Sequence, residues 1–194
     1  MTRTVTRLFD SYSQAQTAVQ KLEDAGFASS EVSLVSRYRD DNTLADEASS
    51  TATGATVGGL AAGGTGLLAA LGMIAIPGIG PLVAAGVLAT TLTAVAAGTV
   101  VGGIIGALLD YGVNEEDAHV YSEAVRRGGS LVTVRAEDDR AGLAETILNR
   151  QKTVDISKRR QAYVEGGWSK YDPTAKGYTA EEIRAERETY GRMR

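Results

Sequence analysis

The chain is divided by one long, uninterrupted stretch of uncharged residues. Residues 48–109 contain no Asp, Glu, Lys or Arg, which makes 62 consecutive uncharged positions. Residues 1–47 hold 5 basic and 8 acidic side chains, and residues 110–194 hold 15 and 16. An apolar segment of this length has to be buried in lipid, in another subunit or against its own domain. We therefore expect two soluble segments on either side of one apolar insert.

The first flanking segment has a strand–helix–strand pattern. Residues 2–9 and 31–37 read as strands, and the stretch between them places apolar side chains at helical spacing. Ser11 with Gln14, or equally Ser13 with Gln16, fits a capping box at the start of this helix. Gly26 is placed to end it in a left-handed conformation.

The second flanking segment repeats the pattern. Residues 130–136 and 153–159 read as strands around a helix capped by Asp138 or Asp139, and a further helix is predicted between Asn114 and Gly128. Two such units predict an α+β fold, a ferredoxin-like βαβ–βαβ sandwich of four strands with two helices on one face. The predicted divisions are 1–47 and 111–160 for the two halves, 48–110 for the insert and 161–194 for a C-terminal tail.

The insert is predicted to be a long apolar, glycine-rich α-helical hairpin. Two helices of roughly 20–28 residues would meet at a turn formed by Pro77, Gly78, Gly80 and Pro81. Small residues four positions apart make a flat groove on a helix, which allows another backbone to approach closely. Four glycine pairs have this spacing: Gly54–Gly58, Gly59–Gly63, Gly98–Gly102 and Gly102–Gly106. The predicted self-association positions among them are Gly58, Gly63, Gly98, Gly102 and Gly106.

The sequence leaves the surroundings of the insert open. Each arm is long enough to span a bilayer, but the flanks carry Asp40, Asp46, Asp110 and Glu115 instead of the Lys and Arg that anchor a cytoplasmic flank. No apolar core follows Arg3 and Arg7, so the N-terminal residues do not predict a signal peptide. We expect a cytoplasmic homo-oligomer, with membrane lipid at the inner face of the cytoplasmic membrane as the alternative or additional partner.

Residues that carry chemistry are scarce. The chain has no cysteine and one histidine, His119, which argues against a catalytic dyad or a multi-histidine metal site. The G-x-G-x-x-A match at 64–69 lacks the preceding strand and the later acid of a dinucleotide site. Lys158-Arg159-Arg160 is a small basic footprint. We predict no catalytic residue, cofactor, metal or nucleic-acid partner, and therefore a protein that is not an enzyme.

The tail contains the only tryptophan and a second capping box, formed by Thr179 and Glu182. The helix that follows has too few apolar residues to fold alone. We expect the tail to dock on its own domain or a neighbouring subunit through Trp168, Tyr171 and Tyr178.

Residues 4–37, the glycine-rich insert and "GGSLVTV" (128–134) together resemble the bacterial heat-induced general-stress-protein family with a glycine-zipper insert, whose relatives are often described as predicted membrane proteins of unknown function. The resemblance implies a stress-associated, non-enzymatic protein and no site residues. The leading hypothesis is a structural or interaction protein whose insert mediates homo-oligomerisation, membrane association or both. The rival is a small-ligand sensor or regulatory binding module that uses the ferredoxin-like sheet.

Overall fold

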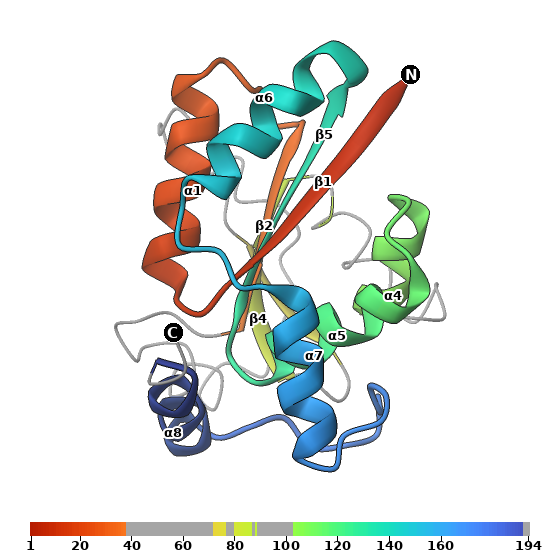
Figure 1. Ribbon diagram of the computed structural model, residues 1–194, viewed down its shortest axis with the longest axis vertical. Coiled ribbons are helices and arrows are strands. Elements are labelled where there is room, and N and C mark those ends of the chain that lie inside the picture. The colour runs from red at the N-terminus through yellow and green to blue at the C-terminus, as the bar shows by residue number, and fades with distance from the viewer. Residues whose placement is uncertain (38–71, 77–79, 87, 89–102, 192–194) are drawn as a thin grey trace.

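The computed structural model describes residues 1–37, 72–76, 80–86, 88 and 103–191. These residues form an α+β structure around a five-stranded antiparallel sheet with the order β1-β5-β2-β4-β3. Helices cover both faces of the sheet (Figure 1). No helix among these residues is long and apolar enough to cross a bilayer.

The two charged segments meet at the centre of the sheet. Strand β5 (Ser130–Glu137) lies between β1 (Thr2–Phe9) and β2 (Val32–Ser36) and runs antiparallel to both. Val134 of β5 is opposite both Val5 and Val32. Strands β1 and β2 therefore run parallel to each other, with helix α1 (Tyr12–Asp24) as the crossover between them.

The insert does not form the predicted helical hairpin where it is described. Instead, Gly72–Ile76 form strand β3 and Gly80–Ala85 form strand β4. The two strands pair with each other, and β4 also pairs with β2. The chain does reverse direction near the predicted turn, but between strands. Pro81 lies in β4 outside the stretch that pairs with β2, so its missing N–H costs no hydrogen bond to β2.

The last predicted strand, 153–159, is also wrong, and with it the ferredoxin-like strand order. Residues Ile156–Glu165 form helix α7, whose first turn is capped by Asp155 through hydrogen bonds from the N–H groups of Ser157 and Lys158. One trace of edge pairing remains, because the Val154 N–H donates to the carbonyl of Leu8 in β1 at 2.8 Å.

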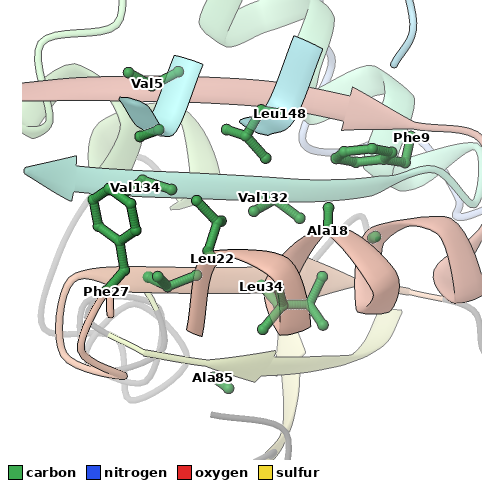
Figure 2. Close-up of a cluster of buried hydrophobic side chains, with 14 of the residues drawn as sticks. Val5, Phe9, Ala18, Leu22, Phe27, Leu34, Ala85, Val132, Val134 and Leu148 are labelled. Carbon is green, nitrogen blue, oxygen red and sulfur yellow. The ribbon is translucent and has the colours of Figure 1, made fainter. Parts of the chain in front are cut away.

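Two hydrophobic cores lie on opposite faces of the sheet. Helices α1 and α6 (Asp138–Asn149) cover one face, where Phe9, Leu22 and Val132 are fully buried (Figure 2). Helices α4 (Gly103–Asp110) and α5 (Glu115–Arg126) cover the other face around Leu108 and Leu131. The sequence predicted helices on one face only; burial of Ala84, Leu88 and Ile104 shows that parts of the insert complete the second core.

Most predicted helix ends are confirmed. Ser11 caps α1 by accepting from the Gln14 N–H, Asn114 caps α5 by accepting from the Asp117 N–H, and Gly26 adopts φ +84° after α1. Neither Asp138 nor Asp139 is the cap of α6. That helix begins at Asp138 itself, after Glu137, whose side chain makes no capping hydrogen bond.

Candidate functional site

Most of the glycines predicted for self-association lie outside the residues that the structure describes. Gly58, Gly63, Gly98 and Gly102 are outside the described residues, and Gly106 lies half-buried in α4. Of the predicted turn, Pro77 and Gly78 are also outside them, whereas Gly80 and Pro81 open strand β4. Of the five predicted self-association positions, the structure therefore describes Gly106 alone.

The three aromatic residues assigned to the tail all lie near α5 and α7. Tyr171 is buried in the second core, and the Trp168 ring meets the Tyr163 ring of α7 edge-on, with 5.7 Å between centroids. The Tyr178 ring lies beside the guanidinium groups of Arg126 and Arg127, at 5.5 and 5.2 Å. The tail then ends in helix α8 (Ala180–Gly191), which opens with the predicted Thr179–Glu182 capping box.

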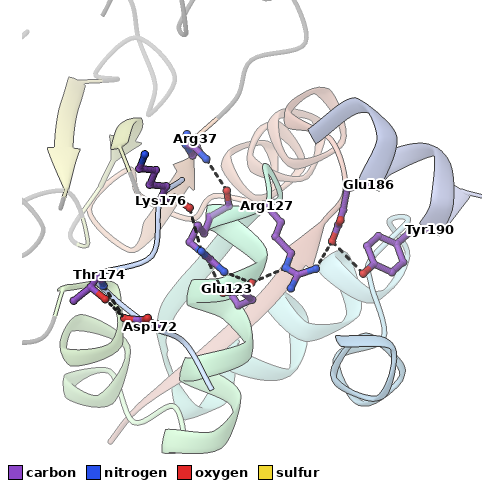
Figure 3. Close-up of polar contacts among 9 residues, drawn as sticks. Arg37, Glu123, Arg127, Asp172, Thr174, Lys176, Glu186 and Tyr190 are labelled. Carbon is purple, nitrogen blue, oxygen red and sulfur yellow. Dashed lines mark hydrogen bonds and ion pairs between the residues drawn. The ribbon is translucent and has the colours of Figure 1, made fainter. Parts of the chain in front are cut away.

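A buried ion-pair network joins α5 to α8 (Figure 3). The Glu123 side chain is 0% exposed and accepts hydrogen bonds from Arg126 at 2.6 and 2.9 Å and from Arg127 at 2.6 Å. Arg127 also donates to Glu186 of α8 at 2.7 Å, and Glu186 in turn accepts from the Tyr190 hydroxyl at 3.1 Å. One carboxylate thus holds two arginines, and one of these arginines holds the C-terminal helix.

Burial and hydrogen bonding shift the pKa values of Arg127 and of two tyrosines beside it, Tyr163 and Tyr190. Burial lowers the pKa of Arg127, but hydrogen bonds to Glu186 and Glu123 outweigh burial and hold that pKa above its usual value. Burial raises the pKa of Tyr163 above its usual value and that of Tyr190 to about 12. At neutral pH Arg127 is charged and both phenols are neutral, which suits a structural clamp better than acid–base chemistry.

Close contact at Gly128 completes the docking of α8. Gly128 has φ +89°, and a Cβ atom at this position would lie 2.4 Å from a methyl carbon of the buried Ile183 side chain. Gly128, where the predicted helix ends, therefore has a second role, since the absence of a side chain there leaves the space into which Ile183 of α8 packs.

Gly128→Ala is expected to loosen α8 because it adds both a left-handed backbone cost of about 1–2 kcal/mol and a contact with Ile183. Hydrogen exchange of residues 180–191 should become faster while the sheet stays protected. Gly142→Ala is the control, because a Cβ at Gly142 meets no atom within 4 Å. Unchanged exchange in α8 would contradict this packing.

A cleft of about 470 Å³ lies beside the network, between α7, the loop that precedes it and Tyr190 of α8. Its lining consists of Lys152, Thr153, Val154, Asp155, Lys158, Arg159, Ala162 and Tyr190. Arg159, nearly buried, pairs with Asp10 at 2.6 Å and lies over the Tyr190 ring with its guanidinium carbon 3.9 Å from the centroid. The cleft is therefore cationic at its rim and aromatic on one wall.

Sequence reasoning missed both features. The E-x-x-R-R spacing places Glu123, Arg126 and Arg127 on one side of the helix. The burial of these side chains, however, depends on the docked tail. The basic run 158–160 is a small basic footprint by sequence, whereas in the structure Arg159 pairs with Asp10 and Arg160 with Asp117. Lys158 alone of the run has no ion pair among the described residues.

Across the described residues, no three His, Asp or Glu side chains gather as a metal site would require. His119 lies on α5, 3.9 Å from Glu115 one turn earlier. Comparison with protein families, with curated proteins and with solved structures found no match to this chain.

Proposed function

We propose that this chain is a non-enzymatic, stress-associated interaction protein whose uncharged segment, residues 48–109, mediates homo-oligomerisation, membrane association or both. The observation that carries the proposal is the complete absence of charge over 62 residues of a chain whose charged residues lie on either side. The association with stress rests on the resemblance of residues 4–37, the glycine-rich insert and residues 128–134 to the general-stress-protein family.

The position of the uncharged segment in the sheet supports self-association. Strand β3, which belongs to this segment, is the outermost strand, and no strand in the described part of the chain pairs with its outer edge. A free strand edge offers unpaired N–H and C=O groups to another chain, and proteins usually protect such edges with charge or proline. The residues of β3, GMIAI, contain neither.

The glycine spacing supports the same conclusion. Gly98, Gly102 and Gly106 are four residues apart in a segment rich in Ala, Val and Ile, a pattern that permits close backbone contact between helices in lipid or in a protein assembly. Close contact gains dispersion energy that bulky side chains at these positions would prevent.

The test is to replace Gly98 and Gly102 with leucine in the full chain and to compare its assembly with that of wild type. We expect the double variant to sediment as a smaller species in detergent-free buffer and to bind less to phosphatidylglycerol-containing vesicles in a flotation assay. The two readouts separate self-association from membrane association.

Gly142→Leu is the matched control, because Gly142 lies exposed in α6 with open space where a side chain would begin. It should leave assembly and flotation unchanged. Unchanged sedimentation and flotation of the Gly98→Leu/Gly102→Leu variant would overturn the proposed role of the glycines.

A further inference from the structure

We propose that the cleft between α7 and α8 binds a small phosphate monoester with an aromatic or apolar body. This inference is independent of self-association and concerns a surface of the helical layer, whereas the ligand hypothesis from sequence concerned the sheet. It rests on the shape of the cleft, on two lysines at its rim that form no ion pair with any described residue, and on the apolar and aromatic residues of its walls.

The size of the cleft matches a small ligand. Its volume of about 470 Å³ falls within the range of roughly 300–1,000 Å³ typical of small-molecule sites. The lining residues come from three places in the chain: the loop after α6, helix α7 and the end of α8. The buried network of Glu123, Arg127 and Glu186 holds α8 in place, so the cleft exists before a ligand arrives.

The charges at the cleft favour an anion. Lys152 and Lys158 are exposed and have no acidic partner among the described residues, whereas Arg159 is paired with Asp10. The acidic lining residue, Asp155, accepts the N–H groups of Ser157 and Lys158 and so is stabilised by the start of α7. Two free ammonium groups match the charge of a phosphate dianion, which lysine binds as a point charge.

The walls of the cleft favour more than a bare anion. Val154, Ala162 and the Tyr190 ring present apolar surface, and the guanidinium carbon of Arg159 lies 3.9 Å from the centroid of the Tyr190 ring. The contact with the Arg159 guanidinium holds the Tyr190 ring in place. Thr153 adds a neutral hydroxyl to the lining of the cleft. A ligand with a ring or short alkyl body gains contact area that inorganic phosphate lacks.

Phenyl phosphate is the probe, titrated into the full chain at low ionic strength and followed by calorimetry and by amide chemical shifts. We expect saturable binding, shifts concentrated at Lys152–Ala162 and Tyr190, and at least about fivefold tighter binding than inorganic phosphate. Lys152→Gln and Lys158→Gln should each weaken binding about twofold to fivefold.

Lys21→Gln is the charge-matched control, because Lys21 is an exposed lysine of α1 outside the cleft. All three lysines are exposed, so the variants should melt at the wild-type temperature. The proposal is overturned if phenyl phosphate does not bind, or if the shifts lie elsewhere. It is also overturned if Lys21→Gln weakens binding as much as the cleft variants. Equal affinity for phenyl phosphate and inorganic phosphate would overturn the apolar part of the site.

Discussion

Replacing Glu123 with glutamine should lower the free energy of unfolding by about 3–5 kcal/mol, since removing one partner from a buried ion pair leaves uncompensated charge. Glu123 is fully buried and contacts both Arg126 and Arg127 at 2.6 Å. Glutamine keeps the shape of the side chain but removes its charge. The buried guanidinium of Arg126 then loses the carboxylate that it pairs with, whereas the partly buried Arg127 keeps its ion pair with Glu186. Urea unfolding followed by circular dichroism measures the change.

The same substitution at Glu137 is the control for the loss of one negative charge. Glu137 is exposed at the end of β5 and makes no capping hydrogen bond to α6, so its replacement by glutamine should change stability by no more than about 0.5 kcal/mol. Equal effects of the two substitutions would mean that α5 and α8 are not joined through Glu123.

Gly86→Ala should destabilise the protein by about 2–5 kcal/mol, the combined cost of a left-handed backbone and of overpacking. Gly86 has φ +81° and follows β4 directly. An alanine Cβ there would lie 1.9 Å from the Val32 carbonyl oxygen and 2.8 Å from the Ser33 Cα, both backbone atoms of β2. Neither atom can move without separating β4 from β2.

Gly26→Ala separates the two costs. Gly26 has nearly the same backbone angle, φ +84°, but a Cβ there meets no atom within 4 Å. It should cost about 1–2 kcal/mol from the backbone alone. Thermal unfolding of both variants measures how much more Gly86→Ala lowers the free energy of unfolding than Gly26→Ala does. If there is no excess, β4 does not pack against β2, and the insert is not part of the sheet.

Local signals predicted much of the fold. Residues 2–9 are a strand from end to end, and Ser11, Asn114 and Thr179 each cap the helix that was expected after them. These features depend on neighbours within a few residues, so the sequence pattern contains the information they need.

The failures share a different cause. The apolar residues of 72–76 and 80–85 suit a helix or a strand, and pairing between distant segments decides between them. Strand β4 pairs with β2, about 50 residues earlier in the chain, and β3 pairs with β4. Residues 154–157 alternate β-branched and polar side chains like a strand, but Asp155 caps a helix whose buried residues are Arg159 and Tyr163. The buried network and the cleft depend on where α8 docks, which no local pattern specifies.

The most direct test of the proposed function is the mass of the wild-type full chain in detergent-free buffer, measured by sedimentation equilibrium over a range of concentrations. Our account predicts a discrete species heavier than the 20.3 kDa monomer, or a chain that leaves solution only to bind vesicles. A stable monomer at all concentrations that also fails to bind vesicles would contradict the claim that the uncharged segment mediates association.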